Sequence, residues 1–555
     1  MPRPFRGTLR VTATVACVAA LGLASCGGGG DDGGDSTPTG RAGGAITTAY
    51  TSFPDFLDPA LSYSTEGWQT LWTVYTPLLT YRHAEGVEGA TLVPGLAESM
   101  PEISDDGTVY ELKLRSGLRY SDGSAVKASD FEHAIKRVLN LESGGSAFYL
   151  GIAGAEKYVE DGRARADIPG IVADDATGDI TITLTKPDGR FPYILAMNFA
   201  ALVPGDTPFR NQTSSPPPGV GPYKLENVRV NRGYDLVRVP SFDVAGQAAG
   251  KLDRIEVAVV KNRRRQTQDT IDNKVDYMLD PPAPDQLRDV RAEYGDTRYS
   301  EHVTNSTYFF FLNRELAPFD KPAVREAVNH AVDKRAIARL FAGLLEPGCN
   351  FLPPGMKGYA KIDPCPYGAP NAAPDIERAR ALIRSAGAEG ESVTVFGNDE
   401  PEPRSVAEYL ADVLNEIGLD ARPRIIEGSV YFTTIGNKRT QAQVGFANWF
   451  QDFPHPANFM FLVDGGSIQD TNNVNFGNVD DPAINALLAQ ANQNADIDAV
   501  AADYARADRL IVQGAHLVPY GHRKLTAFYS ERIDADNCSV WHPVYNLDFT
   551  QLCLK

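Results

Sequence analysis

The N-terminal segment constrains this chain more than any other feature, because it decides the compartment in which the rest must fold. Arg3, Arg6 and Arg10 precede an uncharged, mostly apolar run from Val11 to Leu23. A basic start followed by a short apolar core is typical of an export signal. The run is shorter than the ~20 residues that a helix needs to cross a bilayer core of ~30 Å. We therefore predict that residues 1–25 are a signal peptide and that the remainder folds as a soluble, extracytoplasmic protein.

The signal ends in Leu23-Ala24-Ser25-Cys26, which resembles the lipobox of bacterial lipoproteins. The resemblance implies that Cys26 is acylated and anchors the mature protein to the cell membrane. Residues 26–44 are rich in Gly and Asp, a composition that cannot bury a core, so we expect a flexible linker. The alternative is an ordinary signal peptide that is cut near Ser25, with Cys26 incidental.

Size and charge limit what the mature protein can be. It has roughly 510 residues, and single cores stop growing at about 250–300, so at least two lobes are expected. The chain has 53 Lys and Arg against 71 Asp and Glu, a net charge of −18, and loss of the signal removes three arginines and no acid. Such a charge disfavours nucleic acid as a partner. We expect a monomer, in which the basic run Lys261–Arg265 begins a solvated helix.

Besides Cys26, four cysteines remain in the mature chain, and an exported protein can pair them as disulfides. Of the three possible pairings we favour nearest neighbours, Cys349 with Cys365 and Cys538 with Cys553. Each pair closes a loop of ~15 residues, worth about 3 kcal/mol if unstrained. A zinc site is the alternative, but the chain has no supporting CxxC or HxxxH spacing. We predict no metal and no cofactor.

Helix and strand patterns alternate along the chain and predict an α/β fold. Residues 110–114 and 180–184 alternate apolar and polar side chains, as half-buried strands do. Residues 129–132 have the sequence of a capping box that begins a helix with a buried face. Helix-then-strand units at 375–396 and 405–426 predict layers in which helices cover both faces of a sheet.

Catalytic motifs are missing from the sequence. It contains no P-loop, GxSxG elbow or HExxH helix, and no complete set of serine–lysine acylation motifs. His455, His522 and His542 show no paired spacing and are interpreted as surface or structural residues. We predict that the protein is not an enzyme. The alternatives from other classes are a secreted hydrolase and a surface adhesin.

The most suggestive segment is 448–456, where Trp449, Phe450 and Asp452 lie beside prolines. Pockets for small ligands are mostly apolar with a few placed polar groups. A carboxylate between aromatic walls can hold a ligand ammonium by a charge-assisted hydrogen bond. The alternative is a core tryptophan with an aspartate that caps a turn, and spacing alone favours this second interpretation.

A series of short motifs runs in order over nearly the whole mature chain. The motifs are Leu57–Ala60, Val74–Leu79, Pro94–Ser99, Asp106-Gly107, Leu112–Arg115, Tyr120–Ser124, Ala128–Phe131, Gly219–Tyr223, Phe311–Asn313, Pro318–Asp320, Val324–Ala327, Asp333-Lys334 and Trp449-x-x-Asp452-x-Pro454. Their shared order resembles that of the extracellular solute-binding proteins of family 5, the peptide- and nickel-type receptors of ABC importers. One motif of that family, its usual Asn-Pro-x-Tyr-Trp, is replaced here by Val239–Asp243.

The resemblance implies an α/β, two-lobed periplasmic-binding-protein-like fold with an extra subdomain in the larger lobe. Domain I would comprise 45–82, 200–300 and 517–555, domain II would be 83–199, and domain III would be 301–516. The crossings near 300 and 517 would form the hinge. Ligand would lie between the lobes, and closure would create the surface that a permease reads.

The resemblance also assigns a function and a site. It implies a lipid-anchored receptor that binds oligopeptides and delivers them to the permease of an ABC importer. The same fold with a nickel chelate, haem, opine or oligosaccharide as ligand is the alternative. In peptide-binding relatives an aspartate three residues after a tryptophan holds the peptide α-ammonium. The ligand-binding residues implied here are Trp449, Phe450, Asp452, Tyr63, Ser64 and Thr65.

Overall fold

The structure, a computed structural model, describes residues 40–163 and 166–555. The predicted signal peptide, Cys26 and most of the 26–44 linker lie outside the described residues. Within these residues, no helix combines the length and apolar character that crossing a membrane requires.

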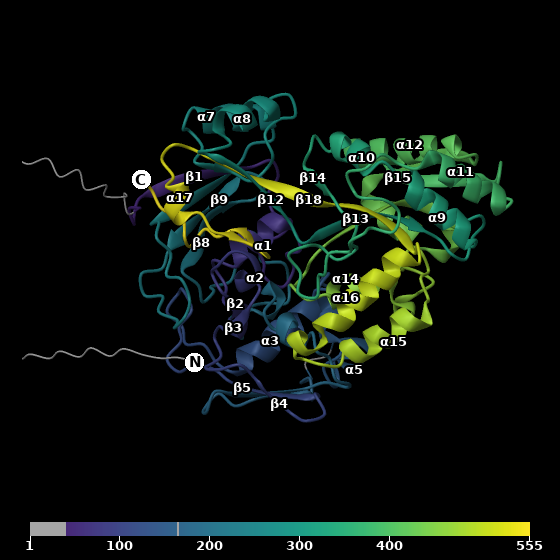
Figure 1. Cartoon of the computed structure of the whole chain (residues 1–555). Helices are drawn as coiled ribbons and strands as arrows, with labels where there is room; N and C mark the ends of the chain where they lie inside the picture. The colour runs from purple at the N-terminus through teal and green to yellow at the C-terminus, as the bar shows by residue number, and fades with distance from the viewer. Residues whose placement is uncertain (1–39, 164–165) are drawn as a thin grey trace, which may run out of the picture. The chain divides into compact units, whose positions relative to one another are not determined.

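The largest element is a mixed sheet of twelve strands within the described residues. Its longest strand, β18 (Leu517–Tyr529), pairs with β13 (Ser306–Leu312) through one half and with β12 (Tyr299–Val303) through the other. Figure 1 shows β18 as the long yellow strand between the two halves of the sheet. The other strands are β16 (Asp420–Ile426), β15 (Ser392–Asn398), β17 (Val444–Phe450) and β14 (Leu345–Pro347) on the β13 side, and β11 (Tyr277–Met278), β1 (Ala45–Tyr50), β10 (Arg254–Val259), β9 (Gly233–Arg238) and β8 (Tyr223–Arg229) on the β12 side.

Amphipathic helices pack against the β13 side of the sheet. In α12 (Pro401–Glu416) the side chains of Val406, Leu410 and Leu414 are fully buried, as their spacing requires. Strands β15 and β16 are parallel and each follows a helix, which confirms the predicted helix–strand units. The other helices of this half are α9 (Pro322–Ala331), α10 (Lys334–Leu340), α11 (Ile376–Ser385), α13 (Tyr431–Ile435), α14 (Ala457–Met460), α15 (Pro482–Ala491) and α16 (Ile497–Gln513).

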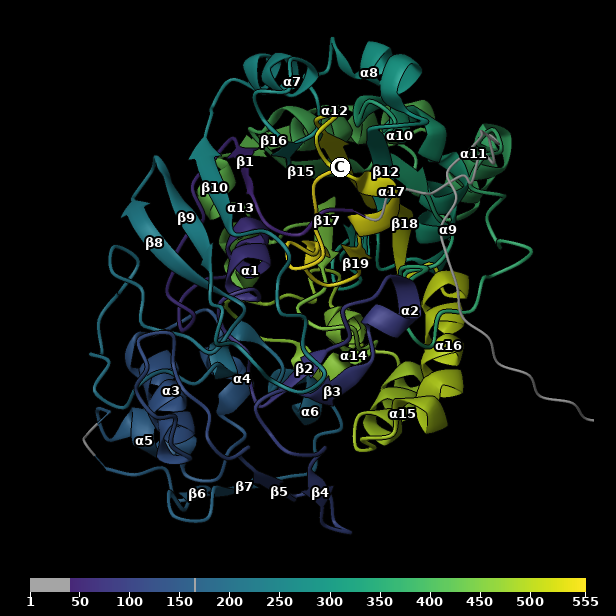
Figure 2. The ribbon, with the colours of Figure 1, turned by 90° about the vertical axis from the view of Figure 1, so that its left-hand side faces the viewer.

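A four-stranded sheet lies at the end of the molecule opposite α7 (Arg263–Ile271) and α8 (Leu287–Tyr294), as Figure 2 shows. The exposed residues 261–265 lead into α7, so the predicted helix start is confirmed. The strands predicted at 110–114 and 180–184 are also confirmed. The sheet consists of β4 (Glu102–Ile103), β5 (Val109–Lys113), β7 (Asp179–Thr183) and β6 (Ile171–Ala173).

The predicted capping box is wrong, although the helix itself, α3 (Ser129–Asn140), is present. Ser129 already lies inside the helix, and its hydroxyl donates to the carboxylate of Asp175 at 3.0 Å. Glu132 accepts from the backbone N–H of Ile168 at 2.7 Å. Both side chains therefore bind segments that are distant in the sequence, and these contacts replace the local cap.

The remaining elements are short and connect the layers. They are α1 (Thr65–Leu71), α2 (Gly86–Gly89), α4 (Ser146–Tyr149), α5 (Ala155–Glu160), α6 (Phe191–Ile194) and α17 (Ala535–Cys538), with the strand pairs β2 (Leu79–Tyr81) and β3 (Leu92–Pro94), and β19 (Trp541–His542) and β20 (Asn546–Leu547).

Two glycines precede β8 at a point where the backbone passes close to another segment. A Cβ at Gly219 would lie 2.3 Å from the carbonyl oxygen of Val74, and a Cβ at Gly221 would lie 2.4 Å from the same atom. Because that atom belongs to the backbone, neither position can take a side chain without movement of the main chain. The Gly-x-Gly-Pro-Tyr motif therefore allows two backbone segments to approach closely.

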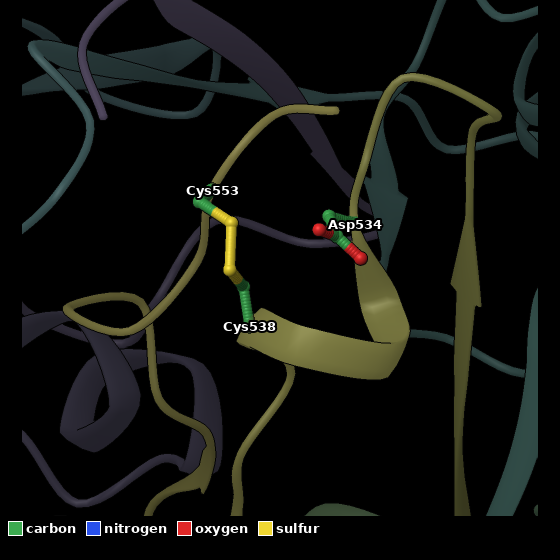
Figure 3. Close-up of side chains that lie close together, drawn as sticks. All are labelled: Asp534, Cys538 and Cys553. Carbon is green, nitrogen blue, oxygen red and sulfur yellow. A yellow bond between two sulfur atoms is a disulfide. The ribbon is translucent and has the colours of Figure 1, made fainter. Parts of the chain in front are cut away.

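Both predicted disulfides form. The Cα atoms of Cys349 and Cys365 are 6.0 Å apart, and those of Cys538 and Cys553 are 5.6 Å apart. Figure 3 shows Asp534 beside the second disulfide. These three side chains are close enough to share a metal ion, but the two sulfurs are joined to each other and offer no thiolate ligand.

Candidate functional site

A cavity of about 110 Å³ brings together segments that are far apart in the sequence. Five of the six predicted ligand-binding residues line it, and Trp449 does not. The lining residues are Tyr63, Ser64, Thr65, Trp68, Thr304, Asn305, Phe450, Gln451, Asp452, Leu525, Pro543, Val544 and Asn546.

Asp452 is the acidic side chain of this cavity. It follows the end of β17, and its two carboxylate oxygens accept separate hydrogen bonds, from the Tyr63 hydroxyl at 2.7 Å and from the Asn458 amide at 2.7 Å. The Asn458 carbonyl accepts from the Asp452 backbone N–H at 2.8 Å and from the Trp449 indole N–H at 3.4 Å. Trp449 is therefore linked to the site through Asn458, which positions the carboxylate.

Tyr63 is held in place from three sides. Its backbone N–H donates to the carboxylate of Asp55 at 2.6 Å. Its ring stacks on Trp68 with centroids 5.6 Å apart and meets the edge of Phe199 at 5.4 Å. Ser64 caps α1 by accepting from the backbone N–H of Gly67. The start of α1 thus directs Tyr63 towards a carboxylate 389 residues away.

Asp452 has no cationic partner within residues 40–163 and 166–555. The residue is only 7% exposed, and burial raises the pKa of its carboxyl to about 6, against a smaller lowering by the hydrogen bonds from Asn458 and Tyr63. The ion pairs of the described residues do not include Asp452. Burial and the nearby Asp452 carboxylate also raise the pKa of the Tyr63 hydroxyl, so it stays a donor. A buried carboxylate with two neutral donors can pair with a ligand ammonium.

Several lining residues were not predicted from the sequence. Asn305 donates to the Gln451 side chain at 2.9 Å, and Gln451 in turn donates to the backbone carbonyl of Pro543. Thr304 and Asn305 lie between β12 and β13, in a short connection without a pattern of its own. For Gln451 the only signal in the sequence was its place within the Trp449-x-x-Asp452 motif.

The three histidines interpreted as surface or structural are all buried. His455 and His542 are fully buried, and His522 is 4% exposed with its Nδ1 2.7 Å from the Ser306 carbonyl oxygen. Burial lowers the pKa of each imidazole to between about 3 and about 4. They are structural and neutral.

Comparison with known proteins assigns the chain to a family. Residues 91–470, more than half of the chain, match the middle part of the bacterial extracellular solute-binding proteins, family 5. The chain belongs to this family. The predicted resemblance is therefore confirmed, and the family consists of solute-binding proteins rather than enzymes.

Members of this family with similar sequences have different ligands in their names. The dipeptide-binding protein DppE of Bacillus subtilis is 23% identical over 510 residues, 89% of each chain. The heme-binding protein A of Haemophilus influenzae is 26% identical over 492 residues, 83% of each chain.

Solved structures confirm the α/β, two-lobed periplasmic-binding-protein-like fold. The clavulanic acid biosynthesis oligopeptide binding protein 2 matches with a TM-score of 0.83 and 25% identity, over 93% of this chain and 96% of its own. The unliganded open form of the periplasmic murein tripeptide binding protein MppA matches with a TM-score of 0.76 and 20% identity, over 93% of this chain and 99% of its own.

Proposed function

We propose that this family 5 protein is the receptor of an ABC importer and binds oligopeptides by their free amino end. Asp452 carries the proposal, because it is a buried carboxylate that lines a cavity and lacks a cationic partner among the described residues. A peptide α-ammonium supplies both the missing charge and N–H donors. The names of DppE, MppA and the oligopeptide binding protein are consistent with a peptide ligand.

The same proposal includes closure of two lobes around the peptide. Tyr63 belongs to proposed domain I (45–82, 200–300 and 517–555) and Asp452 to proposed domain III (301–516), so their hydrogen bond would join the lobes in a closed form. Two of the clusters of buried apolar side chains support the division, because one lies within proposed domain III, apart from its residues at the start of β18, and another within proposed domain I. Proposed domain II, 83–199, shares its cluster with residues 60–81 of proposed domain I. We place the hinge where β12 and β13 succeed each other along β18.

We further propose that Cys26 carries a lipid that keeps the receptor near its permease. The basis is the Leu-Ala-Ser-Cys sequence and the Gly-rich linker that follows it. An anchored receptor has a higher effective concentration at the permease than a released one.

A thermal-shift experiment tests the ammonium anchor. Tri-alanine and N-acetyl-tri-alanine would be compared as ligands of the wild type, Asp452→Asn and Asp508→Asn. Asp508 is a matched control, because it is a buried carboxylate with a pKa also raised to about 6, but it does not line the cavity. We expect stabilisation of the wild type and Asp508→Asn by the free peptide only, and little stabilisation of Asp452→Asn.

The ammonium role fails if free and acetylated peptides stabilise the wild type equally. Native mass spectrometry of the purified protein then identifies the ligand class. A haem, metal chelate, opine or oligosaccharide in the cleft would replace the peptide assignment while keeping the receptor function.

A further inference from the structure

A second cavity adjoins the one that contains Asp452. Its volume is about 320 Å³, and it shares Thr304, Asn305 and Pro543 with the first. His302 of β12 and Leu525 of β18 are direct partners across the strand pair, so their side chains point to the same face. Leu525 lines the first cavity and His302 lines the second. We call the two cavities together the two-chamber cleft.

The charges of this cleft have one sign. The described residues that line the two chambers include three acids, Asp452, Glu85 and Glu301, and neither Lys nor Arg. His302 adds no positive charge near neutral pH, because burial lowers the pKa of its imidazole to about 4. A peptide carboxylate placed in either chamber would therefore meet acids and no cation.

Glu85 differs from Glu301 in how far its charge is offset. Glu301 accepts from Arg291 at 2.5 Å, and Lys524 lies 3.8 Å from its other oxygen. Glu85 accepts a hydrogen bond from the Trp541 backbone N–H at 3.0 Å and takes part in no ion pair of the described residues. Asp452 and Glu85 are thus the uncompensated charges, one in each chamber.

We propose that the cleft selects peptides with a basic side chain, and that Glu85 is a specificity-determining residue that pairs with it. This inference rests on the proposed peptide function and on the amino end being held by Asp452. The Lys or Arg side chain of the second or third residue enters the second chamber, and the peptide carboxylate stays outside both chambers.

The second chamber also suits the aliphatic part of such a side chain. The rings of His302 and Trp541 stack with centroids 4.1 Å apart and an angle of 5°, and together they form a rigid aromatic wall. Long basic side chains lay their methylene groups along apolar surface while the charged end stays solvated. Glu85 is exposed, so its charge contributes modestly, a two- to fivefold preference at low ionic strength.

Isothermal titration calorimetry with matched tripeptides tests the inference. Lysine, norleucine and glutamate would be placed at the second and at the third position of tri-alanine, so that chain length and shape stay similar. The proteins are the wild type, Glu85→Gln and Glu88→Gln. Glu88 is the control, because it lies three residues away, pairs with Arg82 and lines neither chamber.

We expect the wild type to bind the lysine peptide two- to fivefold more tightly than the norleucine peptide at one of the positions, and the glutamate peptide most weakly. Glu85→Gln should abolish the lysine preference, and Glu88→Gln should keep it. The inference is overturned if the lysine and norleucine peptides bind equally at both positions, or if the lysine preference survives in Glu85→Gln. Either result leaves the proposed peptide-binding function standing. Absence of binding by every peptide overturns both.

Discussion

Acidification should weaken peptide binding through a single group, Asp452. In the free protein its pKa is about 6, so roughly nine tenths of the carboxyl groups are ionised at pH 7 and about one tenth at pH 5. A bound ammonium favours the ionised form and lowers this pKa, so peptide binding releases a proton once the pH falls below about 6. The affinity for peptide is therefore highest at neutral pH and falls about tenfold between pH 7 and pH 5. The peptide ammonium, with an ordinary pKa near 8, stays protonated over this range.

Isothermal titration calorimetry measures both consequences. Affinities for tri-alanine at several pH values give the slope, and titrations at pH 5.5 in two buffers with different ionisation enthalpies give the number of protons released. Asp452→Asn is the control, because its amide does not titrate. We expect weak binding by this variant that is nearly independent of pH from 5 to 7.

Two results would refute the reasoning. One is a wild-type affinity that changes less than twofold between pH 7 and pH 5. The other is a pH slope of the same size in Asp452→Asn, which would assign the titration to another group. A ligand that left the pKa of Asp452 unchanged on binding would give no slope, because affinity depends on pH only where binding changes a pKa.

Three further predictions follow from the contacts of the site, the backbone and the anchor. Tyr63→Phe removes a hydrogen bond that lowers the pKa of Asp452, so the midpoint of the affinity–pH profile should move above 6; an unchanged midpoint would contradict that contact. Gly221→Ala should lower the free energy of unfolding by about 1–3 kcal/mol in urea denaturation, because its Cβ would meet the Val74 carbonyl oxygen. Gly151→Ala is its control, since the space beside that residue is open, and equal losses would refute the argument. Cys26→Ala should bind peptide normally but appear in the culture medium, and its retention in the membrane fraction would reject the anchor.

Elements with strong periodicity could be predicted because burial of one face decides their structure. The stripe of Val406, Leu410 and Leu414 fits a helix and no other regular structure, and all three side chains are fully buried. The capping box failed for the opposite reason. Ser129 and Glu132 form hydrogen bonds with segments that are distant in the sequence, and a local pattern does not reveal such contacts.

The candidate site was predictable only in part, for a similar reason. Trp449 and Asp452 lie close together in the sequence, and a resemblance over a few residues is enough to select them. The Tyr63 hydroxyl that meets Asp452 comes from 389 residues away, and nothing in the local pattern around residue 63 states which carboxylate it will contact. Asn458 is only six residues from Asp452, yet its role depends on the turn that follows β17.

The charge of the cleft could not have been inferred from the charge of the chain. A net charge of −18 spread over 555 residues is compatible with a ligand site of either sign, because folding selects a few side chains from distant segments. Here the selection leaves Asp452 and Glu85 without an ion pair among the described residues, while Glu301 is offset by Arg291. Family membership fixes the fold and the solute-binding role, whereas the ligand depends on such selections. Relatives of similar identity can therefore carry names as different as dipeptide-binding and heme-binding protein, and the charges within each cleft are the property by which we expect their ligands to differ.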